Sequence, residues 1–448
     1  MVGPTTLKKS VTIALAQAKK LGATSCEVLI SNGTEEVTRF ANSMIHQSVF
    51  LNDSLVHVRV CIGQKIGVAR TNRIDKEGIS DVVIRAVEIA KLQRADPFFV
   101  GLPEKSSYKK TETYYAKTKH VGPVGRANAV GIVINEAKKA SLVASGAFTE
   151  SENEVAIANS NGVWGYQMGK SASLSTIMMG DKGSGYGAQS AKGGSEINPR
   201  KVGKTAVAKA TLGELIDVPA GEYEVILEPP AVAELLDFFA WLGANARIYH
   251  EGVSFYQGNL GKQFFHESLT IADDPYHPLG YPVAFDYEGF PKKRHLLVDK
   301  GVLTGLTYDS YHANKHKKQN TGHGLLAPNT WGPIPTHMVI EPGDSTVPDM
   351  IKNVKKGLLV TRFWYTRVIH HKQLLLTGMT RDGTFYIENG KIVGRARNLR
   401  YTESVLTAFK NIKSIGKTAV LEGSEGSPSV VPALHIGKFR FTSTTKHG

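Results

Sequence analysis

The chain has 448 residues, of which 41% are hydrophobic and 21% charged, and it contains only two cysteines. This composition excludes a wholly disordered chain, and the scarcity of cysteine excludes a disulfide framework or a four-cysteine zinc site. The net charge of +14 permits polyanion binding, but the basic residues are dispersed and carry no nucleic-acid-binding motif, so nucleic-acid binding is not favoured. The chain has no apolar run as long as a signal-peptide core or a bilayer span, which predicts a cytoplasmic protein without a membrane segment.

The first part of the chain alternates helical and strand-like patterns. Apolar residues with helical spacing, followed by Gly22, predict a helix over residues 5–21. Further helices are expected at 76–93, 124–140 and 200–212. Strands are expected where apolar residues alternate or cluster, at 26–31, 35–40, 43–50, 55–62, 155–160 and 173–180. These patterns indicate helices packed on antiparallel strands.

A glycine-rich segment and a change of pattern divide the chain. Residues 181–195 contain five glycines and predict a flexible surface loop, which is a candidate for a mobile gate. The segment V-P-A-G-E at 218–222 precedes a new strand. We therefore place a domain boundary there, with an N-terminal α+β domain at 1–217 and a larger, β-rich C-terminal domain at 218–448.

The second part of the chain is rich in strand-like runs. Asn389-Gly390 joins two of them and predicts a two-residue hairpin turn. Helices are expected at 231–247, 306–318, 348–356 and 402–412. The whole pattern predicts a two-lobed α+β fold with antiparallel, strand-rich sheets and packed helices.

Short motifs that resemble catalytic sites fail on spacing. Two G-K-T tripeptides, at 203–205 and 416–418, lack the earlier glycine that a phosphate-binding loop needs. Two His-Glu pairs, at 250–251 and 266–267, lack the second histidine of a zinc-protease helix. The residues alone therefore predict no catalytic motif.

His312 and His316 are the better candidates for a metal site. They are four residues apart in a segment that is expected to be helical, so both rings could point the same way. His323 or Asp309 could supply a third ligand, but three nearby lysines disfavour a bound cation. A solvated, basic helix end is the favoured interpretation, and a stand-alone metal-dependent hydrolase that uses His312, His316 and His323 is the alternative.

The order of several sequence blocks gives a more specific result. These blocks are I-A-N-S-N-G-V at 157–163, E-G-V-S-F-Y-Q-G-N-L-G-K-Q at 251–263, L-T-I-A-D-D-P at 269–275, F-D-Y-E-G-F-P at 285–291, D-K-G-V-L-T-G-L at 299–306 and Q-N-T-G-H-G at 319–324. In this order they resemble the TldD/PmbA family, whose members were once described as modulators of DNA gyrase and are now regarded as a peptidase system. The resemblance covers nearly the whole chain.

The resemblance also implies what this chain lacks. TldD-type subunits carry an H-E-x-x-x-H zinc helix and a late cysteine ligand, whereas TldE-type subunits, also called PmbA, lack the metal site. Counting from the serine block places the zinc helix at 237–242, where Asp237 and Leu242 replace the histidines and Phe238 replaces the glutamate. The late cysteine should lie within 420–426, where Glu422 or a neighbour stands instead. The chain is therefore expected to hold no metal and no catalytic residue.

The resemblance implies a role for such a chain. It would be the non-catalytic, TldE-like subunit of a heterodimeric zinc metallopeptidase, with zinc in a TldD-like partner, or a homodimer without that partner. The assembly would degrade or process unfolded or short peptides, and this chain alone would be inactive. The alternative from another class is a polyanion-binding or DNA-gyrase-related protein, which the positive charge suggests.

Overall fold

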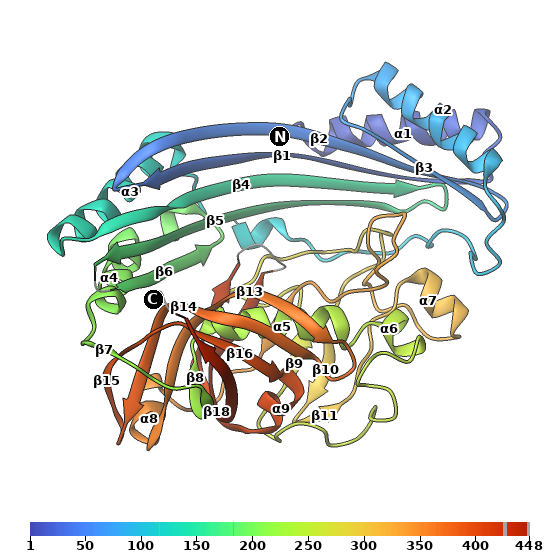
Figure 1. Cartoon of the computed structure of the whole chain (residues 1–448). Coiled ribbons are helices and arrows are strands. Elements are labelled where there is room, and N and C mark those ends of the chain that lie inside the picture. Colours follow the sequence, from blue (N-terminus) through green and yellow to red (C-terminus); the bar gives the residue numbers. More distant parts are fainter. Residues whose placement is uncertain (116, 182, 424–427, 446–448) are drawn as a thin grey trace.

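The computed structural model describes residues 1–115, 117–181, 183–423 and 428–445. In Figure 1, a long, curved sheet from the N-terminal half lies over a second, larger sheet from the C-terminal half. The predicted α+β class with strand-rich sheets and packed helices is confirmed. None of the helices in these ranges combines the length and the apolar character that crossing a membrane would require.

The N-terminal sheet is antiparallel throughout and has six strands, in the order β3-β2-β1-β4-β5-β6. The strands are β1 (Ser25–Ala41), β2 (Met44–Ile62), β3 (Lys65–Thr71), β4 (Val143–Asn159), β5 (Trp164–Gly180) and β6 (Gly183–Ala191). The expected short strands at 26–31 and 35–40 are thus one long strand, and so are those at 43–50 and 55–62. Turn-forming residues misled the prediction, because Asn32 and Gly33 lie inside β1 between two neighbouring strands.

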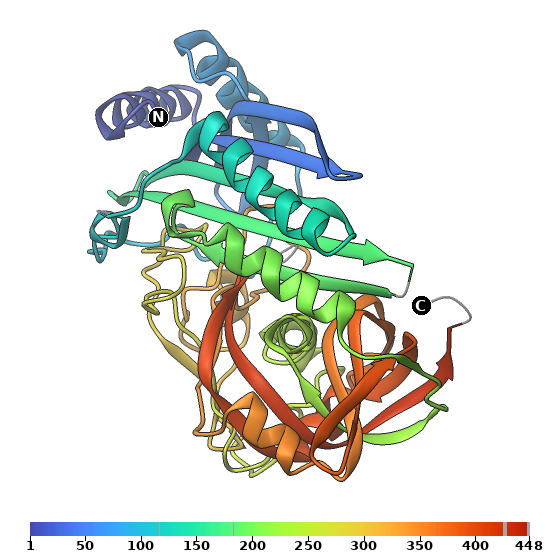
Figure 2. The ribbon, with the colours of Figure 1, turned by 90° about the vertical axis from the view of Figure 1, so that its left-hand side faces the viewer.

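Helices cover one face of this sheet, as the views in Figures 1 and 2 show. They are α1 (Pro4–Lys20), α2 (Lys76–Leu92), α3 (Gly122–Lys139) and α4 (Pro199–Thr211), close to the predicted bounds. Val28 and Ile30 of β1 pack with α1 and α2, and Phe40 farther along packs with α3. Because strand side chains alternate, Leu29 faces the other way and packs with Phe285 of the C-terminal half.

The glycine-rich segment is not the flexible loop that we expected. Residues 183–191 form the regular edge strand β6, and α4 packs directly on it. A Cβ atom on Gly185 would lie 2.2 Å from the Ala206 oxygen, and one on Gly187 would lie 2.3 Å from the Val202 oxygen. These glycines therefore allow close packing of helix on strand rather than loop mobility, and the gate prediction is wrong.

The C-terminal sheet has twelve strands and is mixed, with parallel as well as antiparallel pairs. Its strands are β7 (Leu215–Ile216), β8 (Gly221–Leu227), β9 (Ile271–Asp273), β10 (His295–Asp299), β11 (Val302–Leu303), β12 (Met338–Ile340), β13 (Lys356–His370), β14 (Leu375–Glu388), β15 (Lys391–Ala396), β16 (Leu399–Ser404), β17 (Ile412–Glu422) and β18 (Ser429–Thr444). The predicted hairpin is confirmed, because β14 ends and β15 begins on either side of Asn389 and Gly390, which both have positive φ.

Helices in this half are shorter than the sequence pattern suggested. They are α5 (Pro229–Leu242), α6 (Ala246–His250), α7 (Ser310–Lys315), α8 (Val347–Lys352) and α9 (Val405–Lys410), with 3-10 turns elsewhere at Glu112–Tyr115 and Gly194–Glu196. The expected helix at 231–247 breaks after Leu242, and the one at 402–412 begins as strand β16. Helix α5 packs its apolar side into the main core and is seen end-on near the centre of Figure 2.

A buried ionic network joins the two halves. Arg59 of β2 pairs with Glu27 of β1 at 2.8 Å and lies 3.9 Å from Glu288 of the C-terminal half. Burial raises the pKa of Glu27 to about 7, although Arg59 acts to lower it. Removing charges from water is costly unless they are paired, so this network fixes the sheet over the C-terminal half and sets the shape of the space between them.

Candidate functional site

The main cleft lies between the two halves and has a volume of about 1030 Å³. Its upper wall comes from β4, β5 and β6, which contribute Ser145, Thr176 and Tyr186 among others. Helix α5 and strand β13 form its other walls, and Arg381 and Glu422 also line it. The cleft is large enough for an extended peptide segment.

Helix α5 places its two faces according to helical spacing. Pro229 and Pro230 occupy its first positions, where proline is tolerated, and Gly243 follows its last residue. The face toward the cleft carries Glu234, Asp237, Phe238 and Trp241. The opposite face carries the buried core residues Val232, Leu235, Leu236, Phe239 and Leu242. The residues that the resemblance placed at the zinc site thus separate, because Asp237 reaches the cleft and Leu242 enters the core.

The carboxyl groups of the cleft hold their protons more tightly than ordinary acids. Burial, and then the neighbouring Glu234, raise the pKa of Asp237 to about 7. Burial also raises the pKa of Glu234, against a hydrogen bond from Thr366 and the charge of Arg362, which lower it. Burial raises the pKa of Glu422 to about 8, although Lys209 acts to lower it. Near neutral pH Asp237 and Glu422 are therefore poised between the neutral and the charged form.

Strand β13 supplies most of the cations and aromatic rings, β14 adds Arg381 and β6 adds Tyr186. The Arg362 guanidinium pairs with Asp382 and lies 4.5 Å from the centre of the Tyr186 ring. Arg381 lies 4.4 Å from the Trp364 ring, and Arg367 lies 4.2 Å from the Tyr365 ring. Such cation–π contacts orient guanidinium groups without neutralising them.

These residues do not fit the zinc ion that the resemblance implies for relatives. Zinc sites in proteins use three or four nitrogen, sulfur or oxygen ligands in close array. Of the three positions expected on α5, only Asp237 offers such a ligand toward the cleft, and Leu242 is 1% exposed inside the apolar core. The late segment contributes Glu422, while residues 424–426 lie outside the described part of the chain. Within that part, no three ligating side chains gather into a possible metal site.

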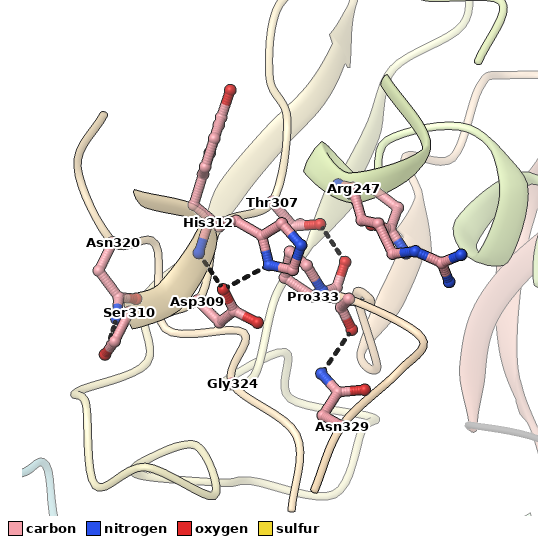
Figure 3. Close-up of polar contacts among 12 residues, drawn as sticks. Arg247, Thr307, Asp309, Ser310, His312, Asn320, Gly324, Asn329 and Pro333 are labelled. Atoms are coloured by element: carbon pink, nitrogen blue, oxygen red, sulfur yellow. Dashed lines mark hydrogen bonds and ion pairs between the residues drawn. The ribbon is translucent and has the colours of Figure 1, made fainter. Parts of the chain in front are cut away.

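The alternative histidine site does not assemble either. His312 is oriented by Asp309, whose carboxylate accepts hydrogen bonds from the His312 backbone N–H and from Nδ1, both at 2.8 Å (Figure 3). His316 instead stacks on His250, with ring centres 3.4 Å apart. Both ring nitrogens of the buried His323 are engaged elsewhere, Nε2 with Asp273 at 3.1 Å and Nδ1 with the hydroxyl of Thr321 at 2.9 Å. The expected helix over 306–318 is only α7, at whose end the rings of His312 and His316 lie nearly parallel with centres 6.5 Å apart. His323, with both nitrogens engaged, does not complete a site with them.

The sequence blocks that carry the resemblance meet in space as a structural core. Asp286 accepts backbone hydrogen bonds from Glu288, Phe290 and Gly324, and so ties two of the blocks together. Glu288 accepts another from Ser310, which lies beside Asp309 in Figure 3. These blocks shape the loops below the sheet rather than supply the cleft's charged groups. Sequence reasoning missed the R-F-W-Y-T-R run at 362–367, in which two arginines flank three aromatic residues of the kind that strands favour.

Comparisons with known proteins agree with this architecture. Three family models match in sequence: PmbA/TldA metallopeptidase domain 1 at residues 26–90, the central domain at 100–213 and the C-terminal domain at 220–440. The metalloprotease PmbA of Escherichia coli O157:H7 is 24% identical over 434 residues, which is 93% of this chain and 90% of the relative. A metalloprotease of Methanothermobacter thermautotrophicus is 24% identical over 64% of this chain and only 63% of the relative. An uncharacterised protein of Methanocaldococcus jannaschii is 26% identical over 46% of this chain and only 49% of the relative.

Solved structures share the fold. TldE from Thermococcus kodakarensis superposes with a TM-score of 0.87 at 19% identity, covering 97% of this chain and 100% of that chain. A Thermotoga maritima protein, a suggested modulator of a DNA gyrase, superposes with a TM-score of 0.84 at 19% identity and the same coverage of both chains. The chain therefore belongs to the TldD/PmbA family of metallopeptidase-like proteins, and its fold is that of TldE.

Proposed function

We propose that this chain is the non-catalytic, TldE-like subunit of a heterodimeric zinc metallopeptidase. Its partner would be a TldD-like chain that carries the H-E-x-x-x-H helix and the zinc ion. This chain would close one side of a shared chamber and hold extended peptides in the cleft between its two halves. The hydrolytic step would belong to the partner, where zinc activates water for attack on the peptide bond.

One observation carries the proposal: the helix at the expected metal position turns a carboxylate and two aromatic rings toward the cleft. Asp237, Phe238 and Trp241 line the cleft, whereas Leu242 packs in the core. A dication beside Phe238 and Trp241 would lose hydration without gaining ligands, which costs several kcal/mol. The same rings offer apolar surface to a bound peptide.

An edge strand beside the cleft supports peptide holding. The cleft is about 1030 Å³, and one of the strands that line it, β6, is an edge of the six-stranded sheet. An extended peptide can add to such an edge through main-chain hydrogen bonds, which tolerate many sequences.

Metal analysis and reconstitution test the proposal. The purified chain should contain less than stoichiometric zinc and should not cleave a mixture of unfolded peptides. Mixed with a TldD-type chain it should form a one-to-one complex that does cleave them. A matched complex, in which the glutamate of the partner's H-E-x-x-x-H helix is replaced by glutamine, should be inactive. Stoichiometric zinc in this chain, with cleavage by this chain alone, would refute the proposal.

A further inference from the structure

Asp237 is an acid without a counter-charge in the cleft. Among the described residues, no hydrogen bond or ion pair reaches its carboxylate, and its pKa is set by burial and by Glu234. A mostly desolvated carboxylate that lacks a partner is costly unless a ligand supplies one. Its position on the cleft face of α5 makes it accessible to a bound cation.

Arg367 is the matching group on the wall that β13 forms. Its side chain is exposed, stacks on Tyr365 and donates to the Thr366 carbonyl oxygen at 2.9 Å, and no carboxylate among the described residues pairs with it. The pairing of β13 with β14 shifts register between Trp364 and Arg367, and Tyr365 has a φ of 58°. Such bulges redirect side chains next to binding sites, and this one brings residues 365–367 into the lining of the cleft.

The two groups come from elements that pack against each other. Helix α5 packs on β13, and both Asp237 and Arg367 line the same cleft of about 1030 Å³. Asp237 lies about one helical turn beyond Glu234 on α5. A short ligand in this cleft can therefore reach both groups.

The charges of the cleft favour a ligand with two opposite ends. Its lining contains three carboxyl groups, Glu234, Asp237 and Glu422, and three guanidinium groups, Arg362, Arg367 and Arg381. A polyanion such as DNA would meet the acids as well as the arginines, so the excess positive charge of the chain is not concentrated here. A molecule with one ammonium and one carboxylate group could neutralise both unpaired residues at once.

We propose that the cleft binds short peptides by their two free ends, with the terminal ammonium group at Asp237 and the terminal carboxylate at Arg367. The proposal rests on the proposed peptide-holding function and specifies its substrate class. The aromatic rings of Trp241 and Trp364 lie along the same cleft and contact the peptide between its ends. The ammonium donates to the Asp237 carboxylate, and the guanidinium donates to the peptide carboxylate.

Calorimetry of the full chain with trialanine in four forms tests the proposal: free, N-acetylated, C-amidated and doubly capped. Free trialanine should bind most tightly, and each cap should weaken binding about tenfold, as expected for loss of one charge-assisted contact. Asp237→Asn should weaken binding of free trialanine by a similar factor and leave binding of the N-acetylated form unchanged. Arg367→Gln should weaken binding of free trialanine by a similar factor and leave binding of the C-amidated form unchanged.

Matched controls are Asp81→Asn and Arg94→Gln, which change exposed residues of like charge outside the cleft. Equal binding of all four forms by the unaltered chain, or no binding of free trialanine at about 10 mM, would overturn the end-recognition proposal. Because these measurements need no partner, a failed reconstitution with a TldD-type chain would refute the proposed function separately. Active complexes with cap-independent binding would leave the proposed function in place.

Discussion

Replacing Asp237 by asparagine should stabilise the protein above neutral pH and have much less effect in acid. Burial, and then Glu234, raise the pKa of this carboxyl from 3.8 to about 7 in the folded protein. The unfolded chain restores its ordinary pKa, so between about pH 4 and pH 7 the folded state binds more protons than the unfolded state. The contribution of Asp237 to the free energy of unfolding therefore falls as the pH rises through this window, and asparagine removes that loss.

The difference between 3.8 and about 7 corresponds to about 4 kcal/mol at full burial. Solvent reaches part of this side chain, so we expect about 2 kcal/mol of stabilisation at pH 8 and about 1 kcal/mol or less at pH 4.5. Urea unfolding of the unaltered chain and of Asp237→Asn at both pH values measures this difference, with Asp81→Asn as the control. A gain of equal size at both pH values, or a loss of stability at pH 8, would refute the reasoning.

Two further predictions concern the scaffold. Gly187→Ala should destabilise the protein by about 1–3 kcal/mol, because its Cβ would lie 2.3 Å from a backbone oxygen of α4. A Cβ atom on Gly131 in α3 would meet open space, so Gly131→Ala should stabilise the protein by about 0.5–1 kcal/mol. A similar effect of Gly187→Ala and Gly131→Ala on the thermal midpoint would contradict this account. Arg59→Ala should cost about 3–5 kcal/mol in chemical unfolding, because it leaves the buried Glu27 and Glu288 without their cation. A loss below about 1 kcal/mol would show that the network does not hold the halves together.

Local signals in the sequence predicted the elements that local physics determines. The helices α1 to α4 and the hairpin at Asn389-Gly390 follow from apolar spacing and turn chemistry. The long strands did not follow, because Asn32 inside β1 is satisfied by neighbouring strands, donating to Glu154 at 3.1 Å and accepting from Ser54 at 2.8 Å. The Asn32-Gly33 pair would by itself favour a turn. Hydrogen bonds with residues distant in the sequence keep it in the strand instead, and a local sequence pattern does not reveal such partners.

The candidate site was only partly predictable for a similar reason. The sequence located the helix that carries Asp237, but a five-residue step turns an ideal helix by about 500° and leaves Leu242 on another face. The arginine wall of β13 lies more than a hundred residues away along the chain and reaches the cleft only through the fold. The bulge at Tyr365 depends on the pairing of β13 with β14, which the sequence pattern did not reveal.

Strand β6 has a consequence for how the cleft evolves. Gly185 and Gly187 lie under the backbone of α4, while Tyr186 between them lines the cleft and contacts Arg362. A single strand thus separates the outer helix from the ligand space, so a bulkier residue beneath α4 would displace the tyrosine ring on the inner side. Changes in ligand preference among homologues should therefore be accompanied by compensating changes on the inner surface of α4, at positions that never touch a ligand.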